Sequence, residues 1–268
     1  MTAPNVGNPT HPAVTNQLRL PRTAALGPGR GGQQRLLIDA PAGAAEIYLH
    51  GATVTSWVPR GGSEVIFTSR QAVFDGATAI RGGIPLCLPE FGVGINGDAV
   101  PKHGWARIAP WQLRMVASTD DGGVRALLSV SRDHLTALYE VEIGETLRLG
   151  LSLRNDGNAP RTVEAAAHTY LSVHDVTASL ISGLAGASYS DNLAHSPQEA
   201  HRVQDGDVKI SGPVDRIYDS AEPVAVTDPG HERTIHVDKL NAPSTIVWNP
   251  WSTYSAPLPD MADDEFPT

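Results

Sequence analysis

The sequence predicts an all-β fold, a large and mostly antiparallel β-sandwich. Short segments in which apolar and polar residues alternate recur along the chain. Gly, Pro, Asn and Asp separate them at intervals of about 8 to 12 residues, as in sandwiches and barrels. No long segment has the 3.6-residue period of an amphipathic helix. A length of 268 residues is usual for one large β domain.

The expected strands follow in chain order, each bounded by turn residues. The first group covers 35–41, 45–51, 53–59 and 64–69. The second covers 111–118, 124–132, 138–144, 145–157 and 162–173, with a hairpin that turns at Gly144. The last covers 208–212, 224–228, 233–238 and 244–250. We expect residues 1–33 to form a loose N-terminal arm and residues 34–268 to form a single sandwich domain.

Residues 183–202 are rich in Gly, Ser and Ala and poor in charge, which predicts a long excursion between strands. Long loops on a β scaffold often carry binding function. A mobile solvent loop without function is an equally good interpretation of this stretch.

The formal net charge of −9 argues against a general binder of nucleic acids or anionic membranes. A single cysteine, Cys87, excludes an intramolecular disulfide, and its apolar neighbours predict a buried, inert thiol. No segment approaches the ~20 apolar residues of a membrane span, and the first residues do not resemble a signal peptide. We therefore expect a cytoplasmic protein that is a monomer or a weak homodimer.

The stretch 79–107 is the strongest candidate for a binding site. Its Gly and Pro residues predict a loop held in one shape by its backbone. Its cations, Arg81, Lys102, His103 and Arg107, could then converge on one anion, such as a phosphorylated ligand. The alternative is that Arg81 and Arg107 are ordinary surface ion-pair partners.

Two further residues could carry chemistry. His168 lies in the apolar segment AAAHTYLSV, where a polar group must find a partner or a ligand, although a satisfied structural histidine is an alternative. Asp215, in VDRIY, could bind sugar hydroxyls or could be an ordinary surface aspartate. The sequence has no HExxH or paired-Cys zinc motif, and no GxSxG, P-loop or GxGxxG. These absences argue against a zinc enzyme, serine hydrolase, NTPase or nicotinamide dehydrogenase.

Several segments together resemble the aldose 1-epimerase-like family. They are LHGATVTSWVP, FDGATAIRGGIPLCLPEFG, PKHGWAR, HTYLSV, VDRIY and IVWNPW. The combination of IRGGIP and HGWAR resembles the glucose-6-phosphate 1-epimerase (hexose-6-phosphate mutarotase) branch, and the resemblance runs from about Gln34 onward. It implies a galactose mutarotase-like β-sandwich that interconverts the α and β anomers of a hexose 6-phosphate without cofactor or metal. A carboxylate would remove the proton of the C1 hydroxyl while a histidine protonates the ring oxygen.

The resemblance also implies roles for single residues. His168 matches the histidine that acts as general acid, and His103 matches a second active-site histidine that holds the ring oxygen or a hydroxyl. Asp215 matches a ligand of the sugar hydroxyls.

The cations of the loop match the phosphate site of the family. Arg81 and Arg107 match its phosphate-binding arginines. Lys102 could add a third cation, although related sequences often carry glutamine there. Trp105 could pack beneath the sugar, but a core position is the favoured interpretation.

One expected residue has no match. The family's catalytic glutamate follows WNPW in a final strand, whereas Glu265 comes too early and lies in an acidic loop. We therefore expect this domain to lack that last strand, or the protein to lack the general base. Two alternatives to the epimerase remain open: a non-catalytic sugar-phosphate-binding protein, and a mutarotase of unphosphorylated aldoses.

Overall fold

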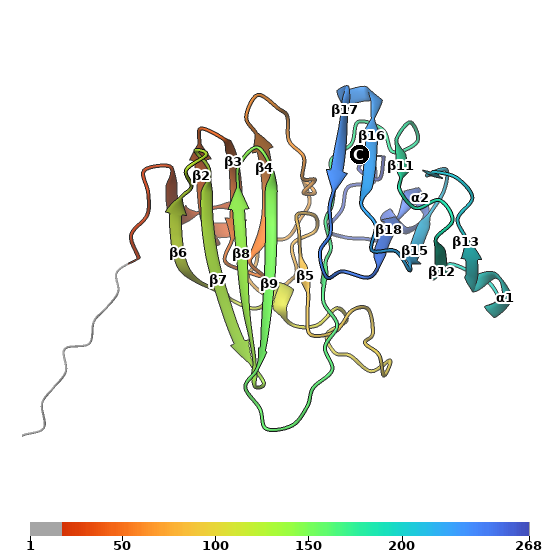
Figure 1. Ribbon diagram of the computed structural model, residues 1–268, viewed down its shortest axis with the longest axis horizontal. Helices are drawn as coiled ribbons and strands as arrows, with labels where there is room; N and C mark the ends of the chain where they lie inside the picture. The colour runs from red at the N-terminus through yellow and green to blue at the C-terminus, as the bar shows by residue number, and fades with distance from the viewer. Residues whose placement is uncertain (1–17, 268) are drawn as a thin grey trace, which may run out of the picture.

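The first half of the chain forms two four-stranded antiparallel sheets around a common core (Figure 1). The computed structural model describes residues 18–267. One sheet has the order β1 (Ala24–Pro28), β2 (Gln34–Ala40), β3 (Gly43–Tyr48) and β4 (Thr53–Pro59). The other has the order β6 (Gln112–Ser118), β7 (Val124–Arg132), β8 (Leu135–Ile143) and β9 (Leu147–Asn155). Alternate residues of both sheets, such as Leu36, Ile47, Leu128 and Val141, are fully buried between them.

The second half repeats this arrangement around a second core. One sheet has the order β14 (Val208–Lys209), β11 (Leu180–Ser182), β16 (Val224–Asp228) and β17 (Arg233–Val237). The other has the order β13 (His201–Val203), β12 (Ser188–Asp191), β15 (Val214–Tyr218) and β18 (Thr245–Asn249). Val208 and Val226 from the first sheet pack with Tyr218 and Val247 from the second.

A two-stranded ribbon, β5 (Leu86–Cys87) with β10 (Ala166–Ala167), lies between the two halves in Figure 1. Helices are short: α1 (Pro197–Ala200), α2 (Trp251–Ser255) and the 3-10 turns η1 (Arg30–Gly32), η2 (Ala106–Ile108) and η3 (Pro229–His231). Within residues 18–267, none of them has the length and apolar character required to cross a membrane.

The strand pattern is largely confirmed, including the hairpin at Gly144, where β8 and β9 pair with Ile143 opposite Leu147. The prediction of a loose arm over residues 1–33 is wrong in its second half. Residues 24–28 form β1, which pairs with β2 along its whole length. The arm's first 17 residues lie outside the described part of the chain.

Three other segments differ from the expectation. The segment 64–69 makes only single bridges, Ile66 to Leu171 and Thr68 to Gly82, because each of its two neighbours pairs with it over only a few residues. The expected strand 162–173 shrinks to β10, for the same reason. The expected excursion over 183–202 instead contains β12 and α1 and leads into β13, so part of its backbone is paired.

Candidate active site

The ribbon strand β5 brings the candidate segments together because it is hydrogen-bonded on both sides. On one side it pairs with β10, and beyond that pair the His168 amide donates to the Pro85 carbonyl at 3.0 Å. On the other side the Ala106 amide donates to the Leu88 carbonyl at 3.0 Å. Two segments some 60 residues apart in sequence are thereby fixed on either side of β5, which directly follows IRGGIP.

His103 is held in an uncommon backbone conformation. Its φ is +67°, in the left-handed region that non-glycine residues seldom adopt, and Gly104 follows with a φ of +70°. A Cβ at Gly104 would lie 2.2 Å from the Leu88 carbonyl oxygen, so only glycine fits there. A left-handed residue at a candidate site is a typical place for backbone strain.

The imidazole of His103 has a defined tautomer. The Gly92 amide donates to its Nδ1 at 3.1 Å, and the His103 amide donates to the Gly92 carbonyl at 2.7 Å. Because Nδ1 accepts a hydrogen bond, the ring proton lies on Nε2. Burial, followed by the positive charge of Arg107, lowers the pKa of His103 to about 4. His103 is therefore a neutral Nε2–H donor near pH 7.

His168 lies in a cluster of aromatic rings. Its ring stacks on Tyr170, with centroids 4.7 Å apart, and meets Trp248 edge-on at 5.8 Å. The ring of His103 is 6.3 Å away. Burial, with smaller contributions from the nearby charges of Arg107 and Arg81, lowers the pKa of His168 to about 4. In the absence of ligand the imidazole of His168 is neutral.

Arg81 is fixed by two side chains. Its Nε donates to Asp260 Oδ1 at 3.1 Å, and its Nη1 donates to the Tyr170 hydroxyl at 3.2 Å. Burial alone would lower the pKa of Arg81, but the contacts with Tyr170 and Asp260 outweigh burial and raise it. Arg81 therefore forms an ion pair, as the alternative interpretation of the sequence expected. The partner, Asp260, is a buried carboxylate and not a surface one.

Arg107, in η2, retains unused donors. Its Nη2 donates to the Lys102 carbonyl at 2.9 Å, while its buried Nε has no hydrogen-bond partner among the described residues. Burial lowers the pKa of Arg107, and the like charge of Arg81 adds to the effect. Two cations that influence each other in a partly buried site favour an anionic ligand. The Lys102 side chain is exposed, so its predicted phosphate contact remains a prediction.

Asp215 belongs to the same site by strand register. On β15 it stands directly opposite Trp248 of β18, and directly opposed residues of an antiparallel pair share one face of the sheet. Because the Trp248 ring contacts His168, Asp215 is on the face that borders the aromatic cluster. Its Oδ1 accepts a hydrogen bond from Asn192 Nδ2 at 3.0 Å.

Glu265 is an anchor for its own segment. Its carboxylate accepts hydrogen bonds from Ser69 Oγ at 2.7 Å and from the backbone amides of Arg70 and Ala262, both at 2.9 Å. Burial opposes its charge, but these donors lower its pKa overall. A carboxylate held this way is a poor general base.

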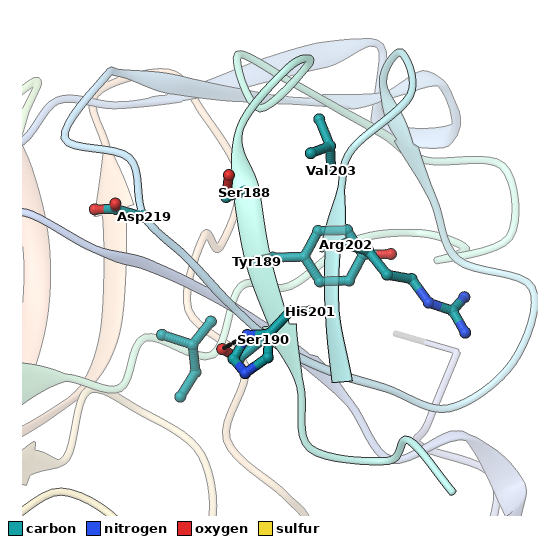
Figure 2. A pocket seen from close by; sticks show the side chains of 8 residues that line it. Ser188, Tyr189, Ser190, His201, Arg202, Val203 and Asp219 are labelled. Carbon is teal, nitrogen blue, oxygen red and sulfur yellow. Dashed lines mark hydrogen bonds between the residues drawn. The ribbon is translucent and has the colours of Figure 1, made fainter. Parts of the chain in front are cut away.

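A hollow of about 400 Å³ opens on the sheet formed by β13, β12 and β15 (Figure 2). Figure 2 shows Ser190 and His201 close together in it, with Ser190 Oγ 3.2 Å from His201 Nδ1. The strand register places the hollow on the same face of the sheet as Asp215 and Trp248. None of the six candidate residues lines the hollow.

Three residues of the site were not predicted from the sequence: Tyr170, Trp248 and Asp260. Tyr170 and Trp248 lie in the segments HTYLSV and IVWNPW, which carry the family resemblance, so their motif position was the available signal. Trp105 packs in the first core, as favoured, and Cys87 is buried. Between residues 18 and 267, no group of three or more His, Cys, Asp or Glu side chains is placed to hold a metal ion.

The fold and the site together define a β-sandwich protein in which two neutral histidines lie close to two arginines. This arrangement is suited to acid–base chemistry on a small anion. The chain belongs to the aldose 1-epimerase family, whose model, described as "Aldose 1-epimerase", matches residues 34–268. The resemblance inferred from the motifs is thus confirmed.

Individual relatives agree with the family. A protein of Cenchrus ciliaris named "Putative glucose-6-phosphate 1-epimerase" is 32% identical over 240 residues, which is 83% of this chain and 71% of the relative. The crystal structure of "a putative mutarotase (YeaD)" from Salmonella typhimurium superposes with a TM-score of 0.84 at 27% identity, covering 94% of this chain and 85% of that one. A galactose mutarotase-like protein from Clostridium acetobutylicum, at 11% identity and a TM-score of 0.68 over 84% and 83% of the two chains, shares the fold. The all-β prediction is confirmed, and these relatives support an isomerase of the aldose epimerase type.

Proposed function

We propose that this protein is a hexose-6-phosphate mutarotase that interconverts the α and β anomers of glucose 6-phosphate or a close relative. The observation that carries the proposal is the position of His168, a neutral imidazole whose pKa is depressed by burial and by Arg107 and Arg81. His168, an acid–base group, is thus close enough to Arg107 and Arg81 to feel their charges, and a bound anion could neutralise those charges. The names of the relatives in grasses and enterobacteria support the phosphorylated substrate.

The phosphate would act on the chemistry as well as on affinity. When a phosphate dianion binds at Arg81 and Arg107, it offsets their positive charge. Part of the effect that lowers the pKa of His168 is then removed, so the pKa rises toward neutrality. His168 can then carry the proton that it donates to the ring oxygen. A substrate without phosphate would leave the charges of Arg81 and Arg107, and their share of the pKa depression, in place.

Other residues would orient the sugar. His103 offers its Nε2–H as a fixed donor to the ring oxygen or a hydroxyl, and Asp215 offers a carboxylate to the hydroxyls. Tyr170 and Trp248 provide an aromatic wall around His168. The C1 hydroxyl also requires a base, a role that the family resemblance gives to a glutamate that no residue from 18 to 267 matches.

The test is NMR exchange spectroscopy between the α and β anomeric protons of glucose 6-phosphate, with catalytic amounts of the protein. We expect accelerated exchange, and we expect His168→Phe to abolish the acceleration. An unchanged exchange rate together with no binding of glucose 6-phosphate by calorimetry would refute the proposal.

A second candidate is a sugar-phosphate-binding protein without catalysis. It is favoured by the engagement of two nearby carboxylates, since Asp260 is paired with Arg81 and Glu265 anchors its own segment. Binding of glucose 6-phosphate without accelerated exchange would support this candidate.

The arginines distinguish a phosphosugar site from a free-sugar site. Loss of a charge-assisted contact should weaken binding of glucose 6-phosphate by roughly tenfold or more in Arg107→Ala. The matched control is Arg148→Ala, which removes an exposed arginine of β9. An unchanged affinity in Arg107→Ala would instead favour a mutarotase of unphosphorylated aldoses.

A further inference from the structure

Asp260 is a buried carboxylate that contacts Arg81, one of the two candidate phosphate-binding arginines. Only 8% of its surface is exposed, and its Oδ1 accepts a hydrogen bond from Arg81 Nε at 3.1 Å. Tyr170 holds Nη1 of the same guanidinium. Two partners on different nitrogens fix the plane of a guanidinium, and its remaining N–H groups are then presented to a ligand in one direction.

The segment that carries Asp260 is itself attached to the backbone beside Arg81. We call residues 256–267 the C-terminal strap. Glu265 in the strap accepts hydrogen bonds from Ser69 Oγ and the Arg70 amide, and the Ser69 amide donates to the Arg81 carbonyl at 3.1 Å. The strap therefore contacts Arg81 in two ways. Glu265 is linked to the Arg81 backbone through Ser69, and Asp260 is linked to the Arg81 side chain directly.

A second attachment holds the far end of the strap. Asn249 Nδ2, at the end of β18, donates to the Phe266 carbonyl at 3.0 Å, and the Val176 amide donates to the Pro267 carbonyl at 2.7 Å. The position of Asp260 is therefore set by the sheet that also carries Trp248, and not by Arg81 alone.

The negative charge of Asp260 is unexpected beside a candidate phosphate site. A carboxylate next to a phosphate site repels the ligand, so by Coulomb's law alone Asp260 would weaken phosphate binding. Its benefit must come from geometry, because a flexible arginine loses conformational freedom when it binds an anion and a fixed one does not.

We propose that Asp260 is a positioning residue, which holds the Arg81 guanidinium in the orientation that binds the phosphate of the substrate. This role rests on the proposed function above, and it makes Asp260 a determinant of selectivity for phosphorylated over free sugar. Asp260 acts through Arg81 and does not itself contact the substrate.

The test is calorimetric binding of glucose 6-phosphate and of glucose to the full chain and to three variants. Asp260→Ala removes the acceptor, and Asp260→Asn keeps an oxygen in the same place without the charge. Asp264→Ala is the matched control, because Asp264 is an exposed carboxylate of the same strap that pairs with Arg70 instead of Arg81. Thermal unfolding of each variant without ligand reports whether it folds.

We expect Asp260→Ala to weaken binding of glucose 6-phosphate by about tenfold, the effect of about one charge-assisted hydrogen bond. Asp260→Asn should recover part of that loss, while the affinity for glucose and the behaviour of Asp264→Ala should stay at wild-type values. If Asp260→Ala does not fold, a loss of a few-fold in Asp260→Asn gives the same support.

Two results would overturn the role of Asp260 alone. Unchanged or tighter binding of glucose 6-phosphate in both Asp260 variants would mean that its charge acts only by repulsion. An equal loss for glucose and glucose 6-phosphate would mean that Asp260 only stabilises the fold. If the wild-type protein itself shows no preference for glucose 6-phosphate, the proposed function fails, and the role of Asp260 fails with it.

Discussion

Replacement of His168 by phenylalanine should make the protein markedly less sensitive to acid. The wild-type imidazole has its pKa lowered from 6.5 to about 4, first by burial and then by the charges of Arg107 and Arg81. In the unfolded chain the pKa returns to its ordinary value. Between these two values the unfolded state binds more protons than the folded state, so the free energy of unfolding falls as the pH falls.

The size of the effect follows from the pKa values. At about 1.4 kcal/mol per pKa unit, the full difference corresponds to about 3.5 kcal/mol, and about 2.5 kcal/mol of it is lost between pH 7.5 and 4.5. Phenylalanine keeps an aromatic ring against Tyr170 and Trp248 but cannot take up a proton. Any packing change in His168→Phe is the same at both pH values and drops out of the comparison.

The assay is urea unfolding at pH 7.5 and 4.5, with linear extrapolation to water. The acid-induced loss of stability should be about 2.5 kcal/mol smaller in His168→Phe than in the wild type. His236→Phe, at an exposed position of β17, tests whether replacement of any histidine has this effect. An equal acid-induced loss in wild type and His168→Phe would refute the assignment of a depressed pKa to His168.

Three further predictions concern the surroundings of this histidine. Gly104→Ala should destabilise the protein by more than about 2 kcal/mol in urea unfolding, because the added Cβ would lie 2.2 Å from the Leu88 carbonyl oxygen at a positive φ. A loss of stability below about 0.5 kcal/mol would contradict this geometry. Nitrogen NMR of His103 near pH 7 should show the neutral Nε2–H tautomer, since Nδ1 accepts from Gly92, and a protonated Nδ1 would disprove that hydrogen bond. Cys87, whose pKa burial raises to about 11, should react with a thiol reagent at pH 8 only after unfolding, and rapid labelling of the native protein would be inconsistent with its burial.

The alternation of apolar and polar residues predicted the strands that pack one face on a core. The strands β2, β7 and β16 were found from alternation, because one face of each packs on a core and a period of two follows directly. The segment 64–69 has a strand-like composition, but its neighbours pair with it over only a few residues, and composition carries no information about the length of a neighbour.

The site depends on contacts that a local pattern does not encode. Arg81 and Asp260 are 179 residues apart, and their ion pair exists because the strap returns to Ser69. Asp215 was selected through a motif, whereas its place beside the aromatic cluster follows from the register with Trp248. Glu265 was set aside as a match for the family's glutamate because of its position in the sequence, and only the three-dimensional structure reveals the donors that hold it.

The reciprocal hydrogen bonds between Gly92 and His103 have an evolutionary consequence. They close the base of the loop between these residues, and the loop's Val93, Ile95 and Val100 are largely exposed. Insertions or deletions among the exposed residues of the loop can change its surface while the imidazole of His103 keeps its position and tautomer. The loop is therefore a place where related chains can differ in length and composition without moving this histidine.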